Sequence, residues 1–264
     1  MSPERRSIPP QSVERAIAIL KAFGEKTPER GINELARELR MHKSTVSRLV
    51  LALERGGLLS RNPETGGYRL GLELLVLAAG VTSHADIRDL ARPHLRRLSE
   101  RCQETANLSV LEGGQVVNLE QAVPREREIR SIGRVGRRTP LHCTAAGKVL
   151  LAHLPRQELD SLLASELARY TPRTITDRHE LQIELERVRE NGYAVALEEL
   201  ETGLNVLSAP VCDGTDRVVA AVSISGPASR LLPENLASLA VEVVGVAHEM
   251  SKELRHHPAN YRME

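Results

Sequence analysis

Six side chains that donate hydrogen bonds fall within residues 42–48 (HKSTVSR): His42, Lys43, Ser44, Thr45, Ser47 and Arg48. The remaining residue, Val46, is followed by Leu49, Val50 and Leu53 at the spacing of a helix with one apolar face. The pattern therefore predicts a helix that buries this face and turns the donors outward. Such donors bind phosphates and base edges of duplex DNA, and Arg48 is suited to a two-pronged contact with guanine. A solvated polar helix is the alternative.

The charge of the chain is unevenly distributed. Over 264 residues, 36 basic and 35 acidic side chains give a formal charge of +1. Residues 1–70 hold 13 basic and 8 acidic side chains, whereas residues 71–264 hold 23 and 27. This distribution places any polyanion contact near the N-terminus, although an excess of this size also arises by chance. Aromatic residues make up only 2% of the chain, which argues against single-stranded nucleic acid bound by base stacking.

A second group of residues predicts an anion site. Residues 144–147 (TAAG) open a predicted helix with small side chains, which leaves its first backbone N–H groups uncovered for a negative ligand. Ser223 and Ser225 stand two apart on a predicted strand, so both hydroxyls lie on one face. Ordinary packing is the alternative for each of these residues. Lys148 occupies a first helical turn, where the dipole disfavours a cation, and this position predicts a specific partner.

An arginine-rich stretch precedes that helix. One of its guanidinium groups could pair with the carboxylate of a ligand. A solvated loop or a subunit interface would explain the same composition. The residues concerned are Arg125, Arg127, Arg130, Arg134, Arg137 and Arg138.

The spacing of apolar residues and turn formers predicts three helices and a hairpin in the first 70 residues. Ser12 is a candidate cap for the first helix, which ends at Phe23-Gly24, and Asn33 is a candidate cap for the second. Gly56-Gly57 ends the third. Residues 58–61 and 68–70 flank the turn-forming run 62–67 (NPETGG). This order is typical of a winged helix-turn-helix.

The remainder of the chain predicts an α+β domain. Residues 72–86 form a helix that is apolar on most faces, which favours dimerisation through this helix, with an ordinary buried core helix as the alternative. An antiparallel sheet flanked by helices should follow. The expected strands are 106–111, 116–121, 193–198, 206–212 and 218–225. The expected helices are 87–98, 144–154, 158–167, 180–191 and 236–247, with a loop at 125–138. The predicted organisation is a basic tail (1–10), a winged helix-turn-helix (11–71), a linker helix (72–86), an effector domain (87–256) and a C-terminal tail (257–264).

The residue types and their spacing give little indication of a catalytic site or a metal site. His142-Cys143 precedes a helix whose dipole would stabilise a thiolate, so a Cys/His hydrolase with a winged-helix interaction module is the alternative function. Adjacent side chains on an extended segment point apart, however, and the chain has no GxSxG elbow. Cys102, Cys143 and Cys212 show neither disulfide nor metal-site spacing. We therefore expect no catalytic residues, no metal and no cofactor. Without an apolar run of 18 residues or a secretory signal, we expect a cytoplasmic protein that does not enter membranes.

Motifs spread over residues 11–254 resemble those of the IclR family of bacterial transcription regulators. They are SVERAIAIL, HKSTVSRLVLALERGGLL, GGYRLGLELLVLA, ETANLSVLEGGQVVNLEQ, VGRRTPLHCTAAGKVLLAHL, TPRTITD, VRENGYAVALEELETGLNVLSAPV and VVAAVSISGP. The resemblance implies a winged helix-turn-helix joined by a helix to an effector-binding domain of GAF-like fold. It also implies dimers that often pair into tetramers, and it leaves repression and activation open.

The resemblance implies two sites. The helix beginning near Lys43 would lie in the major groove of a near-palindromic double-stranded operator, Arg61, Tyr68 and Arg69 would form the wing contacts, and Arg5 and Arg6 could add a minor-groove arm. The second site would hold a small metabolite, a carboxylate with an apolar body, and would modulate DNA binding. Its expected residues are Thr144, Ala145, Ala146, Gly147, Ala196, Val206, Ser223 and Ser225.

Overall fold

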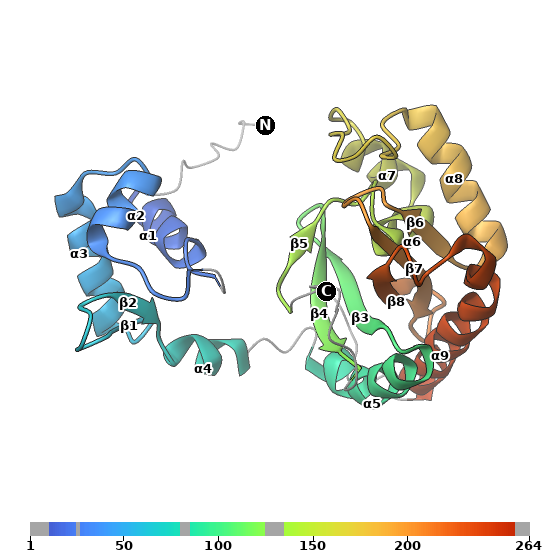
Figure 1. Ribbon diagram of the computed structural model, residues 1–264, viewed down its shortest axis with the longest axis horizontal. Helices are drawn as coiled ribbons and strands as arrows, with labels where there is room; N and C mark the ends of the chain where they lie inside the picture. Colours follow the sequence, from blue (N-terminus) through green and yellow to red (C-terminus); the bar gives the residue numbers. More distant parts are fainter. Residues whose placement is uncertain (1–10, 25–26, 80–84, 125–134, 257–264) are drawn as a thin grey trace, which may run out of the picture. The chain divides into compact units, whose positions relative to one another are not determined.

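The computed structural model describes residues 11–24, 27–79, 85–124 and 135–256, which belong to two compact units (Figure 1). The first unit comprises residues 1–82 and the second comprises residues 83–264. The predicted tails, with Arg5 and Arg6, lie outside the described residues, as do Arg125, Arg127, Arg130 and Arg134 of the arginine-rich stretch.

The first unit is a winged helix-turn-helix, as predicted. It consists of α1 (Gln11–Lys21), α2 (Ile32–Glu38), α3 (Lys43–Arg55), β1 (Leu59–Arg61) and β2 (Tyr68–Leu70). The two strands pair antiparallel as the wing. The predicted apolar faces form one core, in which Ile19, Leu35, Val46 and Val50 are fully buried. These contacts fix the orientation of α3, and with it the side on which its polar residues lie.

The helix caps differ from the prediction at two positions. Ser12 lies within α1, because that helix begins at Gln11. Gly31, and not Asn33, caps α2, and the Glu34 carboxylate accepts a hydrogen bond from the backbone N–H of Gly31 at 3.1 Å. The cap therefore uses a carboxylate of the first turn, which reaches back to the N–H group of the residue before the helix. The predicted end of α3 is confirmed, with Gly56 as its C-cap and Gly57 at φ +71°.

Helix α4 (Glu73–Ala79) leaves its apolar residues exposed. Leu72 just before it, and Leu75, Val76 and Leu77 within it, are each more than half exposed in the single chain. Within the first unit, these exposures do not fit the alternative prediction of an ordinary buried core helix. The predicted helix continued to residue 86, but residues 80–84 lie outside the described part of the chain and the next helix begins at Ala85.

The second unit is built on a six-stranded antiparallel sheet with the strand order β5-β4-β3-β8-β7-β6, which confirms the α+β class. The strands are β3 (Thr105–Glu112), β4 (Gln115–Ala122), β5 (Arg138–Thr139), β6 (Ala194–Leu197), β7 (Leu204–Cys212) and β8 (Val218–Pro227). The helices are α5 (Ala85–Cys102), α6 (Ala145–Ala152), α7 (Arg156–Leu162), α8 (Arg178–Asn191) and α9 (Leu236–His256), with a 3₁₀ turn, η1, at Pro233–Asn235.

The two faces of this sheet pack against different helices (Figure 1). Leu108, Val222 and Leu207 lie on the face that α5 and α9 cover. Side chains one position further along each strand point to the other face, where α6, α7 and α8 form a second core. The strand alternation thus leaves part of this second face, close to the start of α6, for polar residues. This is the region of the predicted anion site.

Two segments of the second unit differ from the prediction. Arg138, the last residue of the expected loop, and Thr139 pair with Val117 and Val116 as β5, a strand too short to show an alternating pattern. Helix α7 ends at Leu162, before the expected end of this helix at residue 167. Leu163 and Leu167 are nonetheless buried, so burial can follow a helical spacing after the helix has ended. No helix in the described part of the chain is long and apolar enough to cross a membrane.

Candidate nucleic-acid interface and ligand pocket

The polar residues at the start of α3 form an exposed face. Lys43, Ser44, Ser47 and Arg48 are exposed, whereas Thr45 is half-buried and Val46 is buried. His42 caps the helix: its Nδ1 accepts a hydrogen bond from the backbone N–H of Ser44 at 3.4 Å and lies 2.7 Å from the Ser44 hydroxyl. The start of the helix therefore presents two cationic side chains, several hydroxyls and the exposed His42 imidazole.

The wing presents a smaller surface than the sequence indicated. Arg61 is exposed, as expected. Tyr68 is only 7% exposed and packs in the core of the winged helix, which corrects its expected role as a contact residue. Because neighbouring residues on a strand point to opposite faces, the inward Tyr68 turns Arg69 outward. Arg69, however, forms an ion pair with Glu29, with 2.6 Å between Nη2 and the carboxylate.

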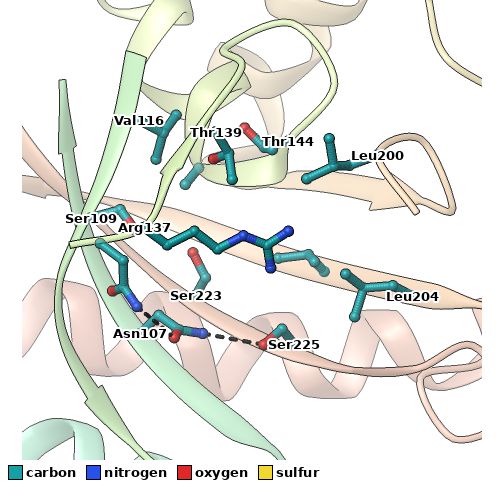
Figure 2. Close-up of a pocket in the computed structure, with 13 residues that line it drawn as sticks. Asn107, Ser109, Val116, Arg137, Thr139, Thr144, Leu200, Leu204, Ser223 and Ser225 are labelled. Atoms are coloured by element: carbon teal, nitrogen blue, oxygen red, sulfur yellow. Dashed lines mark hydrogen bonds between the residues drawn. The ribbon is translucent and has the colours of Figure 1, made fainter. Parts of the chain in front are cut away.

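A pocket lies on the second face of the sheet, beside the start of α6 (Figure 2). About 580 Å³ of space lies between its walls, with the open mouth and the adjoining solvent included. Five of the eight predicted effector residues line it: Thr144, Ala146, Val206, Ser223 and Ser225. The other lining residues are Asn107, Ser109, Val116, Asn118, Arg137, Thr139, Leu200 and Leu204.

The other three predicted effector residues have packing positions. Ala145 is fully buried and Ala196 is 3% exposed, both in the core between the sheet and α6 to α8. Gly147 lies so close to the chain at Leu141 that an added Cβ would meet the Leu141 carbonyl oxygen at 2.1 Å. Their small side chains thus allow α6 to approach its neighbours closely, which corrects the expectation that they face the ligand.

Hydrogen bonds link the polar residues at the base of the pocket (Figure 2). Asn118 Nδ2 donates to Asn107 Oδ1 at 3.2 Å, and Asn107 Nδ2 donates to the Ser225 hydroxyl at 3.2 Å. The Ser223 hydroxyl donates to Ser208 at 2.9 Å. The sequence analysis missed the two asparagines. Asn107 pairs directly with Ser223 across the sheet, so the strand alternation that identified the serines could also have identified Asn107.

Arg137 carries positive charge across the pocket, and Figure 2 shows its guanidinium extending over the cavity from the β5 side toward Leu200 and Leu204. Among the described arginines of the arginine-rich stretch, Arg137 lines the pocket, whereas Arg138 donates to the Glu112 carbonyl at 3.1 Å. Arg137 also forms an ion pair with Glu201, which belongs to the segment between β6 and β7. That segment supplies Leu200 to the pocket wall.

The start of α6 forms another wall of the pocket. The Thr144 hydroxyl donates to the Pro140 carbonyl at 2.8 Å and accepts from the Gly147 N–H at 3.1 Å. This cap satisfies one of the first N–H groups of the helix, and the positive end of the helix dipole still points toward the cavity. The pocket therefore combines a cation and a helix N-terminus with apolar side chains from Val116, Leu200, Leu204 and Val206.

Lys148 has the specific partners that its position predicted. The side chain is 1% exposed, and its Nζ lies 2.6 Å from Glu199, 3.2 Å from Glu184 and 3.0 Å from the Val195 carbonyl. Burial raises the pKa of Glu199, and the neighbouring Lys148 ammonium partly offsets this effect. The contacts join α6, α8 and the segment after β6, so Lys148 supports the pocket from behind without lining it.

The environment of the Cys143 thiol is unfavourable for a nucleophile. It is fully buried, and burial raises its pKa to about 12, whereas a reactive cysteine has a lowered pKa. The adjacent His142 directs Nε2 to the Ala168 carbonyl at 2.9 Å. These contacts give no support to the hydrolase alternative. The described residues contain no group of three or more potential metal ligands from His, Cys, Asp and Glu.

Comparisons with known proteins cover nearly the whole chain. The family model described as the bacterial transcriptional regulator IclR C-terminal domain matches residues 79–252, and the IclR helix-turn-helix domain matches residues 12–63. The regulator XynR of Escherichia coli K12 is 37% identical over 92% of this chain and 97% of its own length. The repressor AllR of Klebsiella pneumoniae is 34% identical over 92% of this chain and 90% of its own.

A solved structure with a bound ligand also resembles the chain. An IclR homologue from Microbacterium hydrocarbonoxydans, in complex with 4-hydroxybenzoate, is 26% identical and covers 93% of this chain and 99% of its own, with a TM-score of 0.82.

Proposed function

This chain belongs to the IclR family of bacterial transcriptional regulators, and we propose that it binds a near-palindromic operator as a homodimer whose DNA affinity is set by a small carboxylate. The family consists of ligand-responsive regulators that bind DNA through a helix-turn-helix. The proposal adds the symmetry of the operator, the chemical class of the effector and the residues that contact each. It also places the protein with the chromosome in the bacterial cytoplasm.

The exposed start of α3 supports the DNA-binding part of the proposal. Arg48 and Lys43 lie on the surface that a recognition helix inserts in the major groove, and His42, Ser44, Thr45 and Ser47 lie beside them. Arg48 would read a base, and Lys43 would contact a phosphate. The exposed apolar surface of α4 supports dimerisation, because a large exposed apolar patch typically marks an interaction site. Two copies related by a two-fold axis would read an inverted repeat.

The position of Arg137 carries the effector part of the proposal. A guanidinium over a largely apolar cavity favours a ligand with a carboxylate at one end and an apolar body. The positive end of α6 adds to this preference. The Microbacterium relative binds 4-hydroxybenzoate, a ligand of this description. The hydroxyls and amides of Ser223, Ser225 and Asn107 would then contact polar groups at the other end.

The effector must distinguish two arrangements of the protein if it is to alter DNA binding. Arg137 and Glu201 tie β5 to the segment between β6 and β7, and both segments contribute to the pocket wall. A carboxylate that binds Arg137 competes with Glu201 for the guanidinium. The segment after β6 is therefore the part of the second unit in which we expect the ligand to act first.

Calorimetry with a matched pair of ligands tests the effector assignment. We expect 4-hydroxybenzoate, and monocarboxylates of similar size, to bind at least about tenfold more tightly than the corresponding neutral amides, because a hydrogen bond to a charged group contributes about 1.5–3 kcal/mol. Arg137→Gln should abolish this preference. Arg138→Gln, the neighbouring residue that lies outside the pocket, should retain it. Equal affinity of acid and amide for the native protein, or an unchanged preference in Arg137→Gln, would contradict the assignment.

The same ligands test the coupling between the two units. An acid that binds the pocket should change the affinity of the native protein for its operator and should leave that of Arg137→Gln unchanged. If saturating ligand leaves operator affinity as it was, the pocket does not control DNA binding through this ligand.

A further inference from the structure

The wing of this protein is too short to be stable alone. Its strands β1 and β2 have three residues each, and an isolated two-stranded hairpin is marginally stable in water. The turn between them is ordered by its own polar residues. Asn62 Oδ1 accepts from the backbone N–H of Glu64 at 3.1 Å, and the Thr65 hydroxyl accepts from the N–H of Gly67 at 3.2 Å. Something outside the hairpin must fix its position against the helices.

A carboxylate outside the hairpin accepts hydrogen bonds from three side chains of the hairpin. Glu29 lies before α2, and its Oε2 accepts hydrogen bonds from Asn62 Nδ2 at 2.9 Å and from Arg69 Nε at 2.6 Å. The Thr65 hydroxyl donates to the other oxygen, Oε1. These hydrogen bonds, above all the one from Thr65, lower the pKa of Glu29, so the carboxylate is ionised at neutral pH. The three donors come from the residue that follows β1, from the turn and from β2.

The backbone around Glu29 follows the wing closely. The next residue, Arg30, exchanges two hydrogen bonds of 2.9 Å with the backbone of Tyr68, so residue 30 pairs with β2. Gly67 faces Glu29 so closely that an added Cβ would come within 2.5 Å of the carboxylate. The segment before α2 thus pairs with β2 at Arg30, directly beside Glu29.

We propose that Glu29 is a positioning residue for DNA binding, which clamps the wing to the helices and holds Arg69 away from the phosphates. A carboxylate suits this role because it accepts hydrogen bonds from all three donors, whereas an amide has one acceptor oxygen and would present N–H groups to the donors. The clamp has a consequence for charge. Arg69 is neutralised by Glu29, so Arg61 is the exposed wing arginine that contributes to phosphate binding.

The salt dependence of binding counts phosphate contacts and tests this assignment without a known operator. The probe is a random-sequence DNA duplex, bound to the full-length protein over a salt series. Each lost phosphate contact reduces the magnitude of the slope of log K, the logarithm of the binding constant, against the logarithm of the salt concentration by about 0.9. Arg61→Gln should reduce the slope by about this amount, and Arg69→Gln should leave it unchanged. A reduction in Arg69→Gln equal to that in Arg61→Gln would overturn the proposal.

Glu29→Gln should release Arg69 and steepen the slope by about 0.9, because one more cation then reaches the phosphates. It should also speed hydrogen exchange of the Gly67 and Tyr68 amides at least about tenfold, since the wing opens locally. Glu64→Gln is the matched control: it removes the same charge from an exposed acid on the same turn, outside the clamp. Equal effects of Glu29→Gln and Glu64→Gln, or no change in either measurement, would overturn the proposal. If Glu29→Gln does not fold, the salt slopes of Arg69→Gln and Arg61→Gln test the proposal by themselves.

Discussion

Lys148 shows how one side chain can determine the stability of the effector domain. Its ammonium is buried between Glu199 and Glu184, and Glu199 is itself only 7% exposed. Removing one partner of a buried ion pair leaves the other charge without compensation, at a cost of about 3–5 kcal/mol. We expect Lys148→Met to lower the free energy of unfolding by this amount at pH 7, measured by urea denaturation. Arg187→Met, which removes an exposed cation from α8, should change it little.

The pH dependence of the Lys148→Met variant follows from Glu199. Burial already raises the pKa of Glu199 in the folded protein, and loss of the Lys148 charge, which lowers it, raises it further. Between the unfolded and the folded pKa, the folded state then binds more protons than the unfolded state, so stability falls as pH rises. The loss in free energy of unfolding, relative to the native protein, should therefore be small at a pH below the unfolded pKa of Glu199. It should grow as the pH rises through the higher folded pKa of Glu199. A variant whose deficit shrinks toward neutral pH would refute this account.

At the residue scale, the sequence predicts side-chain direction better than side-chain partners. The alternation of β2 is sufficient to place Tyr68 and Arg69 on opposite faces, although both residues were expected among the wing contacts. Strand alternation also placed Ser223 and Ser225 together in the pocket. The Glu29 pairing with Arg69 joins residues 40 positions apart. Such a contact depends on the packed fold, so local spacing does not reveal it.

At the element scale, the close approach of α6 to the Leu141 segment fixes the wall of the pocket. Gly147→Ala would place a Cβ 2.1 Å from the Leu141 carbonyl oxygen, so the helix must shift. We expect a loss of about 1–3 kcal/mol in stability, as for other overpacked sites, and weaker carboxylate binding, because Thr144 and Ala146 move with the helix.

Gly245→Ala supplies the control for the α6 prediction. Gly245 lies within α9, and an added Cβ there meets nothing within 4 Å. That change should raise stability by about 0.5–1 kcal/mol, because alanine favours the helix over glycine. Thermal unfolding of the two variants measures both effects. Similar stability changes for the two glycines would show that α6 tolerates the shift.

Helix α4 carries the dimerisation prediction. Leu75 and Val76 are 68% and 63% exposed in the single chain. We expect the double variant Leu75→Glu/Val76→Glu to sediment as a monomer and to lose affinity for a two-half-site operator, because charged side chains would be buried in the interface. Val241→Glu changes another exposed apolar residue, on α9, and should leave the mass unchanged. A double variant that keeps the sedimentation coefficient of the native protein would contradict the role of α4.

The elements themselves could be predicted largely because their patterns are long. Helix α3 and strands β7 and β8 span enough residues for an apolar period to be recognised. Strand β5 has two residues and exists through its pairing with β4, so its local sequence carries no period. The end of α7 was misplaced for the opposite reason. Leu163 and Leu167 keep a helical spacing and are buried, although the backbone there no longer forms a helix.

At the scale of the whole molecule, the division into two units could be predicted from the charge distribution and from the change between the winged-helix pattern and the α+β pattern. The pocket could be predicted only in part. Its wall at Thr144 and its serines lie in recognisable local patterns, whereas Asn118 and Arg137 reach it from β4 and the segment before β5. Sheet order brings these segments together, and sheet order is a property of the assembled fold. The resemblance to a known family supplied the domain order but not these residues.

The central claim, that two copies of the winged helix read a symmetric operator, is tested most directly by selection from a random duplex DNA library. The native protein is incubated with the library, the bound duplexes are sequenced, and a salt series is measured on the enriched site. We predict an inverted repeat with half-sites about one helical turn apart, and a steep fall of affinity with salt. Enrichment of a single half-site would contradict dimeric reading, and the absence of any enriched sequence would contradict the assignment of α3 as a recognition helix.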